Sequence, residues 1–312
     1  MDISSRRYQL ITKKGRNLLW SSIRFVLLTG LIFIILSPII FYVSNAFKSY
    51  TDMYDVTVLY IPREPTLNNF KMLINYIDYG ITLLKTIGFT VLVASLQTLS
   101  CLLVGYGLAR FSFIGNKIIF ALVMVTLVIP PQIMLVPIYI RFRNFNILET
   151  FKFSGVLSGV SLIDTPWPII MLAITALAFK SGLYVFLFRQ FFSNLPVVLE
   201  EAAAIDGCNT YVTFFRIMLP NAVNMVVTVF LFSFVLQWND YYYTTMLMPD
   251  ISTLNMKIAD TAYYFGSVIK NTEMLERVFY PSYLLLIIPL IILYAFAQRF
   301  FVESVATSGI VG

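Results

Sequence analysis

Long apolar runs separated by polar stretches dominate this chain. A bilayer core about 30 Å thick is crossed by about 20 apolar residues in helical form. Six runs approach or exceed this length: Phe25–Phe47, Thr86–Ala109, Ile118–Ile140, Pro168–Phe188, Asn221–Trp238 and Tyr280–Gln298. In a bilayer every backbone polar group needs a partner within the protein, which favours helices over strands. The pattern predicts an all-α membrane protein with six transmembrane helices.

The composition agrees with a protein that faces lipid. Of the 312 residues, 59% are hydrophobic and 12% are charged, whereas a soluble domain carries about 25% charged residues. The net charge of +6 does not indicate a nucleic-acid partner, because the basic residues do not gather into one long patch. Their largest group lies just before the first apolar run and consists of Arg6, Arg7, Lys13, Lys14, Arg16 and Arg24.

This basic group predicts the orientation of the chain. Lys and Arg residues that flank the first helix favour the cytoplasmic side. Six spans then return the C-terminus to that side. We therefore expect a multi-pass membrane protein with both termini in the cytoplasm.

The sequence offers few groups for covalent chemistry. It contains no histidine, which removes the commonest general base and metal ligand. Cys101 lies in an apolar run and Cys208 in a polar loop, so no disulfide is expected. No G-x-x-x-x-G-K-[ST] phosphate loop occurs. We expect no catalytic residue, no metal site and no cofactor in this chain, and hence no enzyme activity of its own.

The polar loop between the fourth and fifth runs, residues 189–220, carries the strongest functional signal. Pro196 suits the first turn of a short helix, with Ser193 or Asn194 as its cap. Gly207 is expected to end this helix at a positive φ, and a second helix follows. So short a helix has little to bury by itself, which indicates a contact for a cytoplasmic partner.

The spacing within this loop matches a known motif. Glu201–Ala203 is followed after three residues by Gly207, and after nine more by Ile217 and Leu219–Pro220. This order resembles the EAA loop of permease subunits in bacterial ATP-binding-cassette (ABC) importers. The segment Gln237–Tyr241 resembles the one that follows the fifth span in carbohydrate permeases of the MalG type.

The resemblance extends from about Pro62 to the C-terminus. It departs from the family in the last residues, where Ser304 and Ser308 replace common glycines, and in Asn144–Asp164, which is longer than usual. The resemblance implies a type I ABC importer permease fold in the bacterial cytoplasmic (inner) membrane. It divides the chain into a cytoplasmic arm (1–24), a first transmembrane helix with an outer loop (25–80), a permease core (81–300) and a cytoplasmic tail (301–312).

The resemblance also implies partners and a role. A homologous second permease subunit, two ATPase subunits and an extracytoplasmic solute-binding protein would complete the importer, with ATP and Mg²⁺ bound by the ATPase. The substrate would be a carbohydrate, with an oligosaccharide as the first expectation. Glycerol phosphate or another polyol is the alternative within the class. An autonomous secondary transporter also fits six spans, but would leave the EAA loop unexplained.

Two sets of residues follow as candidate sites. In the family the EAA loop docks on the ATPase, and the matching positions here are Glu201, Ala202, Ala203, Asp206, Gly207, Ile217, Leu219 and Pro220. The substrate pathway is expected to include Lys180, Trp238, Asn239, Asp240 and Tyr241.

The pathway residues have competing explanations. A lysine at the centre of a membrane helix costs roughly 2.5–3.5 kcal/mol, so Lys180 should line a translocation cavity or pair with another group. Lys85 lies near the end of the second predicted span, and its side chain is expected to reach the membrane–water interface. Trp238 and Tyr241 fit either an aromatic belt or stacking against sugar rings. Pro130-Pro131 interrupts the third run, which fits a broken helix at a transport site or ordinary packing.

Overall fold

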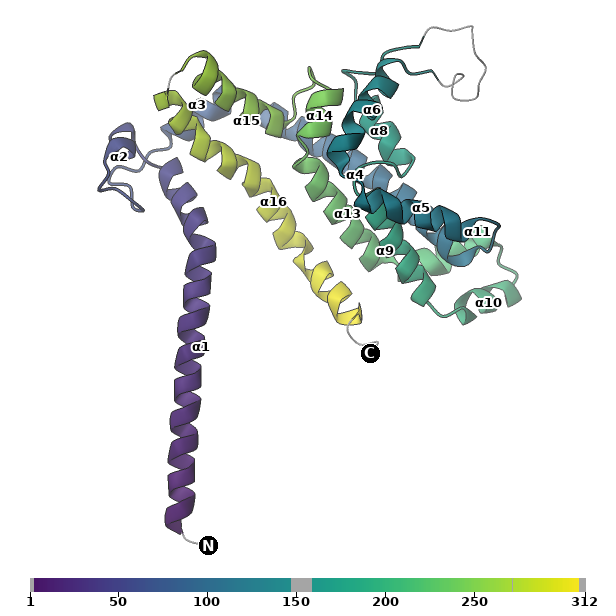
Figure 1. Cartoon of the computed structure of the whole chain (residues 1–312), viewed down its shortest axis with the longest axis horizontal. Coiled ribbons are helices and arrows are strands. Elements are labelled where there is room, and N and C mark those ends of the chain that lie inside the picture. Colours follow the sequence, from purple (N-terminus) through teal and green to yellow (C-terminus); the bar gives the residue numbers. More distant parts are fainter. Residues whose placement is uncertain (1–2, 147–158, 271, 309–312) are drawn as a thin grey trace. The chain divides into compact units, whose positions relative to one another are not determined.

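The computed structural model describes the backbone of residues 3–146, 159–270 and 272–308 (Figure 1). Side chains are described for residues 19–146, 159–270 and 272–298. Every regular element in these ranges is a helix. The expected all-α fold is therefore confirmed. Most of Asn144–Asp164, the segment that is longer than usual, lies outside the described residues.

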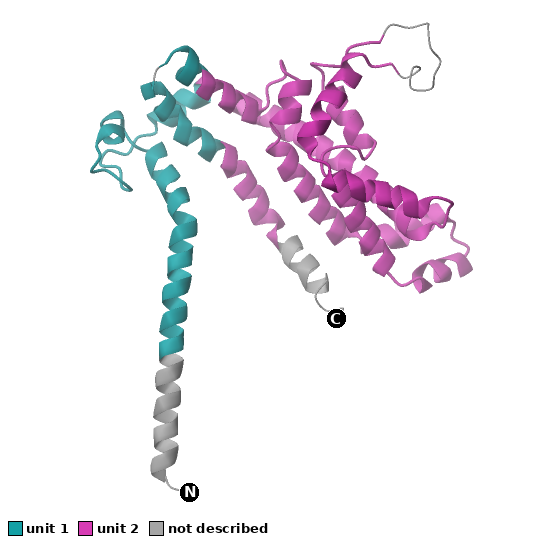
Figure 2. Ribbon diagram, in the orientation of Figure 1, with its two compact units in different colours: residues 1–75, 264–285 teal, residues 76–263, 286–312 magenta. Residues whose placement is uncertain are grey.

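The chain divides into two compact units (Figure 2). The first comprises residues 1–75 and 264–285, and the second residues 76–263 and 286–312. This division reflects packing alone. It leaves the expected boundaries at residues 24, 80 and 300 as predictions, although one helix runs without a break across residue 24.

The first unit contains long and short helices. Its elements are α1 (Ile3–Ala46), α2 (Tyr50–Tyr54), nearly all of α3 (Asn68–Tyr76), the π-helical turn η2 (Tyr264–Val268) and the start of α16 (Thr272–Ser308). Aromatic rings near the end of α1 pack on the start of α16. The ring centroids of Tyr42 lie 5.6 Å from Tyr280 and 5.7 Å from Tyr283.

The second unit holds most of the helices and the rest of α16. They are α4 (Tyr79–Arg110), α5 (Asn116–Val128), α6 (Pro131–Arg143), α8 (Trp167–Ile174), α9 (Ser181–Asn194), α10 (Val198–Ile205), α11 (Thr210–Thr213), the π-helical turn η1 (Phe214–Met218), α12 (Leu219–Asn221), α13 (Val223–Trp238), α14 (Tyr242–Leu247) and α15 (Leu254–Tyr263). At its centre α4 packs along α9 and α13 (Figure 1).

Three of the six predicted spans are continuous helices of sufficient length and apolarity. They are Leu19–Ala46, Tyr79–Arg110 and Thr272–Gln298, which correspond to the first, second and sixth runs. The fifth run forms α13, bent by 74° from the short helices before it. Counting each bent pair of helices as one span gives up to six spans in the described chain.

The third run is not one helix. It breaks between α5 and α6, whose axes differ by 107°. Pro131 has no N–H for a helical bond and its ring clashes with the preceding turn, and Pro130 restricts Ile129 in turn. Ile129 is accordingly extended, with φ −71° and ψ 121°. Pro131 then opens α6, the helical position that proline tolerates best.

The prediction of a single helix over Pro168–Phe188 was wrong. α8 ends at Ile174 and α9 begins at Ser181, and the loop between them holds Ala176 and Lys180 at φ of 56° and 64°. No proline or glycine lies between these two residues. The break is tolerated in an apolar region because a side chain of α4 satisfies part of the freed backbone, as described below.

Close contact between α4 and α9 depends on Gly105. The buried side chains around it belong to a core cluster that includes Cys101, Leu102, Tyr184 and Phe188. A Cβ placed on Gly105 would lie 2.5 Å from the Cβ of Phe188 and 3.1 Å from the backbone N of Arg189. The two helix backbones therefore approach as closely as they do only because position 105 has no side chain.

We expect Gly105→Leu to separate α4 from α9 and to lower the folded yield severely. Overpacking of a close-packed core typically costs about 1–3 kcal/mol, and here the obstacle is backbone as well as side chain. Gly107→Leu is the matched control, since a Cβ at Gly107 meets nothing within 4 Å. The measurement is the amount of monodisperse protein in detergent. Equal yields of the two variants would contradict this account of the helix contact.

Candidate functional site

The loop 189–220 folds as two short helices with a glycine turn. α10 ends at Ile205, and Gly207 adopts φ +79°, the left-handed conformation expected of it. Asn209 then caps α11, because its side chain accepts a hydrogen bond from the N–H of Val212 at 2.9 Å. Figure 1 shows α10 beyond the ends of α9 and α11.

The expected cap of α10 was wrong. Ser193 and Asn194 are the last residues of α9. Leu195 is extended, and α10 starts only at Val198. The helix of α9 continues through these two polar residues, so α9 runs further than the sequence indicated.

The residues of the Glu-Ala-Ala motif differ in exposure. Glu201 and Ala202 are exposed, whereas Ala203 is 2% exposed. Among the described residues, the carboxylate of Glu201 has neither an ion pair nor a hydrogen bond. Exposed apolar side chains surround the motif, with Ile205 86% and Tyr211 76% exposed. α10 thus presents a free carboxylate and apolar surface together.

Glu200, the residue before the motif, has the opposite environment. Its carboxylate lies 3.4 Å from Nε of Arg110 and accepts a hydrogen bond from the hydroxyl of Tyr106 at 3.1 Å. Arg110 also donates to the carbonyl of Leu195 at 2.8 Å, and its side chain is only 8% exposed. These contacts, which we call the α4–α10 latch, hold α10 on the end of α4.

The latch was missed at the level of sequence. Glu200 and Glu201 are adjacent acidic residues in a helix of eight residues, and the motif singles out only the second. Arg110 and Tyr106 lie about 90 positions earlier in the chain, and only the fold shows that they meet Glu200. The sequence feature that could have indicated this contact is Arg110, a basic residue at the end of an apolar run.

The remaining residues of the coupling set lie on both sides of the turn. Asp206 is exposed and caps the C-terminus of α10. Ile217 and Leu219 are half-buried and pack against the core cluster that contains Phe192 and Met218. Pro220 is exposed in α12. The second half of the loop is thus seated on the helix bundle while α10 projects from it.

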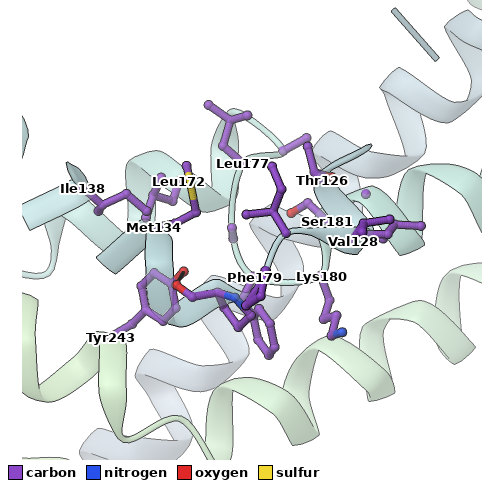
Figure 3. Close-up of a pocket in the computed structure, with 17 residues that line it drawn as sticks. Thr126, Val128, Met134, Ile138, Leu172, Leu177, Phe179, Lys180, Ser181 and Tyr243 are labelled. Atoms are coloured by element: carbon purple, nitrogen blue, oxygen red, sulfur yellow. Dashed lines mark hydrogen bonds between the residues drawn. The ribbon is translucent and has the colours of Figure 1, made fainter. Parts of the chain in front are cut away.

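A cavity of about 430 Å³ lies where two broken helices meet. The break between α5 and α6 supplies one wall, the loop between α8 and α9 another, and Tyr243 of α14 a third (Figure 3). Leu177, Phe179 and Lys180 are among its lining residues. Prolines 130 and 131 line it too, so the interruption of the third run coincides with a cavity.

Lys180 is exposed beside this cavity and has no ion pair among the described residues. Its ammonium lies 5.2 Å from the centroid of the Phe179 ring. Figure 3 shows the Lys180 and Phe179 side chains extending to the same side of their loop. Lys180 was expected either to line a translocation cavity or to pair with another group. Within the described chain it has no charged partner for such a pair.

The other predicted pathway residues are not gathered around the cavity. Trp238 is 1% exposed, stacks on Phe234 and donates to the carbonyl of Leu286 at 3.3 Å. Stacking of Trp238 against a sugar was an expectation that this burial contradicts. Asn239 bonds back to the Val235 carbonyl, and Tyr241 is 38% exposed next to Tyr242.

Asp240 lies in a small neighbouring pocket with Phe179 and Tyr243. Its carboxylate accepts hydrogen bonds from the N–H groups of Tyr243 and Thr244 and from the Thr244 hydroxyl. Three donors therefore hold this carboxylate at the start of α14, and its immediate role is to shape that turn.

A buried glutamine holds the loop that carries Lys180. The side-chain amide of Gln97, on α4, donates to the carbonyl of Phe179 at 2.8 Å and to the hydroxyl of Ser181 at 2.9 Å. Its amide oxygen accepts from the hydroxyl of Ser233, on α13, at 2.5 Å. One side chain thus links α4, α13 and the start of α9.

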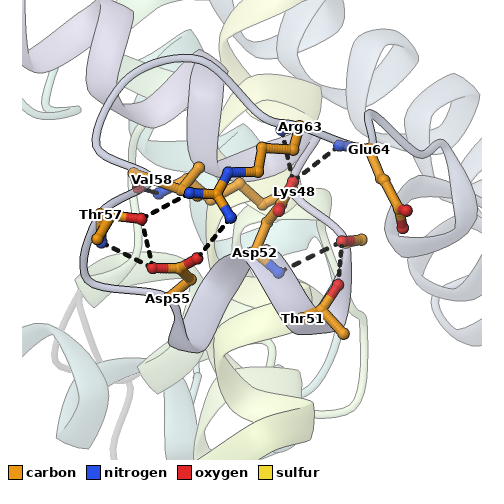
Figure 4. Close-up of polar contacts among 9 residues, drawn as sticks. Lys48, Thr51, Asp52, Asp55, Thr57, Val58, Arg63 and Glu64 are labelled. Carbon is orange, nitrogen blue, oxygen red and sulfur yellow. Dashed lines mark hydrogen bonds and ion pairs between the residues drawn. The ribbon is translucent and has the colours of Figure 1, made fainter.

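The loop after α1, in the first unit, is held by a second polar network (Figure 4). Asp52 is buried, and its carboxylate accepts from the N–H groups of Arg63 and Glu64 at 2.8 and 3.0 Å. Hydrogen bonds from Thr57 hold the pKa of Asp55 below its usual value, with Arg63 contributing. The loop is therefore a folded structure.

Comparison with known proteins identifies the family. Residues 101–307 match the sequence model of the binding-protein-dependent transport system inner membrane component, and this stretch includes the α4–α10 latch and the glycine turn. The chain belongs to this family. It is thus a membrane component of a transport system rather than a catalytic subunit. The family that the sequence resemblance predicted is confirmed.

Relatives of this permease share its length. It is 27% identical over 82% of its chain to the arabinooligosaccharides transport system permease protein AraQ of Halalkalibacterium halodurans, of which 84% is covered. It is 25% identical to the melibiose/raffinose/stachyose import permease protein MelC of Bacillus subtilis, covering 80% of this chain and 83% of MelC.

A solved structure has the same fold. It is a bacterial ABC transporter involved in the import of the acidic polysaccharide alginate. The permease matches one of its chains with a TM-score of 0.73 and 18% identity, over 92% of this chain and 98% of that one. The expected importer permease fold is therefore confirmed.

Proposed function

We propose that this permease is one of two membrane subunits of an ABC importer for a carbohydrate, with an oligosaccharide as the leading substrate class. The relatives AraQ, named for arabinooligosaccharides, and MelC, named for melibiose, raffinose and stachyose, support this class. A homologous second permease, two ATPase subunits that bind ATP and Mg²⁺, and a solute-binding protein outside the membrane complete the assembly. Glycerol phosphate and other polyols are the alternative substrates.

One observation carries the coupling role. α10 displays the unpaired carboxylate of Glu201 together with exposed Ile205, and Tyr211 of α11 is exposed beyond the turn, while Glu200 fastens α10 to α4. One face of α10 is therefore committed to its own subunit and another is open to a partner. This is the arrangement that a helix needs to receive a motion from an ATPase and pass it on.

The connections from α10 reach the cavity. α9 leads directly into the loop before α10 and begins at the residue after Lys180. Its 14 residues span about 21 Å as a helix. α4 joins the latch at Arg110 to the cavity loop at Gln97. Movement of α10 when the ATPase dimer closes would thus reach the loop between α8 and α9, one wall of the cavity, along both routes. The cavity would then open alternately to the two sides of the membrane.

We expect the purified permease alone to hydrolyse no ATP and to transport nothing. It lacks a phosphate loop, and it supplies half of the pathway in this proposal. Reconstitution with the second permease, the ATPase and the loaded binding protein should give ATP-dependent uptake of an oligosaccharide into liposomes. Robust uptake by the single chain without ATP would instead indicate a secondary transporter and refute the proposal.

The proposed orientation places both termini in the cytoplasm. A reporter fused after Gly312 should therefore be active only as a cytoplasmic reporter, and one inserted near Ile61 only as an external one. Ile61 is 82% exposed, so an insertion there disturbs little packing. The measurement is the ratio of phosphatase to fluorescent-protein activity. An external C-terminus would show that one of the interrupted runs does not cross the membrane.

A further inference from the structure

We infer that the cavity beside Lys180 selects an anionic substrate, a sugar or polyol that carries a carboxylate or a phosphate. This inference rests on the proposed import function and names the substrate class more narrowly. It depends on the charge in the cavity, on the backbone that presents this charge and on the chemistry of the cavity walls.

Lys180 is the free charge at this cavity. No ion pair neutralises its ammonium within the described residues, and its nearest aromatic contact is Phe179 of the same loop. Asp240, an acidic residue that lines the neighbouring pocket, is engaged by three hydrogen-bond donors at the start of α14. An exposed ammonium without a counter-ion among the described residues is available to pair with an anionic substrate.

The backbone of the loop between α8 and α9 is strained at Lys180. Its φ of 64° is in the left-handed region, where a non-glycine residue stores about 1–3 kcal/mol of strain. Glycine would relieve this strain, but the left-handed position holds Lys180, and the glycine of this segment, Gly182, lies two residues later. The amide of Gln97 holds the preceding carbonyl in place, so the strained loop is fixed rather than free to relax.

The remaining walls suit the body of a sugar or polyol. Phe179 and Tyr243 stack with ring centroids 6.4 Å apart and an interplanar angle of 25°. With Leu177 and the two prolines they give mainly apolar walls around few polar groups, and a volume of about 430 Å³ is within the usual range for ligand sites. Such walls accept the C–H faces of a sugar, and Lys180 supplies the single strong contact with an anionic group.

Transport by the complete importer tests this selection. The probes are trigalacturonate for a carboxylate, glycerol 3-phosphate for a phosphate and maltotriose as the neutral reference, each supplied with the importer's own binding protein. We expect import of a charged probe. Lys180→Gln should reduce that import at least tenfold, and Lys180→Arg should keep it within threefold. Lys85→Gln, which removes a charge at another exposed lysine, should leave it unchanged.

The outcomes separate this inference from the importer function. Import of maltotriose alone, or import of a charged probe that Lys180→Gln does not change, overturns the selection of anions. Both results leave ATP-dependent carbohydrate import intact. Absence of ATP-dependent uptake of any carbohydrate or polyol by the unmodified importer would refute the proposed function. A second measurement decides the charge question independently of uptake.

The second measurement reports the electrostatic potential in the cavity. Val128 lines the cavity and is 82% exposed, so Val128→Cys can be labelled after Cys101 and Cys208 are replaced by serine. The readout is the labelling rate with an anionic sulfonatoethyl methanethiosulfonate divided by that with its cationic trimethylammonium analogue. Lys180→Gln should lower this ratio at least fivefold and Lys85→Gln should not. An unchanged ratio shows that Lys180 does not set the charge of the cavity.

Discussion

Gly207→Val is expected to abolish coupled transport while the protein still folds and inserts. Gly207 holds φ +79°, a conformation in which a β-branched residue is a rare outlier. A Cβ at this position meets no atom within 4 Å, so the effect is one of backbone strain and not of a clash. Strain of roughly 1–3 kcal/mol is relieved most easily by changing the turn, which redirects α10.

The turn lies outside the helix bundle, and this position decides which functions are lost. None of the core helices α4, α9 or α13 depends on φ at residue 207, so membrane insertion and yield should be normal. The ATPase should bind weakly, or its hydrolysis should no longer respond to the loaded binding protein. The measurements are co-purification of the ATPase and substrate-stimulated hydrolysis in the reconstituted importer.

A graded series makes the test specific to the backbone. Asn tolerates the left-handed region better than other non-glycine residues, so Gly207→Asn should retain most coupling, with Gly207→Ala between Asn and Val. Gly88→Val is the matched control, because Gly88 is within α4 and a Cβ there also meets nothing within 4 Å. If the Val and Asn variants at position 207 couple equally well, the left-handed turn does not position α10.

The sequence predicts those features that depend on neighbouring residues. The apolar runs give the continuous spans, Pro130 and Pro131 mark the break between α5 and α6, and Gly207 marks the turn. Each of these follows from local backbone chemistry, in which proline lacks a donor and glycine lacks a Cβ. Their positions could therefore be predicted from the sequence, whereas the 107° angle between α5 and α6 could not.

Features that depend on distant partners could not be predicted in this way. The break before α9 contains no proline or glycine, and it is supported by Gln97, 82 positions earlier than the Phe179 carbonyl that it binds. The burial of Trp238 likewise depends on Leu286, 48 positions later. An apolar pattern shows that such residues avoid water, but it does not distinguish a pathway from a packed interior.

The same limit applied to the two adjacent glutamates. α10 is too short for its apolar pattern to show which of Glu200 and Glu201 faces the subunit. The fold answers this by bringing Arg110 and Tyr106 to Glu200. The two residues therefore have different expected effects on substitution, since only Glu200 has a partner within the permease.

We expect Glu200→Gln to uncouple ATP hydrolysis from transport, and Glu201→Gln to weaken binding of the ATPase. Loss of the charge at Glu200 leaves Arg110, with a side chain 8% exposed, without its counter-ion. Hydrogen bonds to charged groups contribute roughly 1.5–3 kcal/mol, so α10 should separate from α4 in a large fraction of molecules. The ATPase can still bind through Glu201, but its motion is no longer passed to α4.

A charge exchange distinguishes this transmission from a general loss of structure. Arg110→Glu and Glu200→Arg should each lower transport per ATP hydrolysed at least tenfold, and the double variant should recover a substantial part of it. Coupling between the two substitutions in such a cycle reports their direct interaction. Lys117→Glu is a suitable control, since Lys117 is an exposed basic residue just beyond α4 and outside the latch. Additive effects of the two exchanges on transport per ATP would mean that the latch does not carry the motion, and that α9, the covalent route from α10 to the cavity, carries it alone.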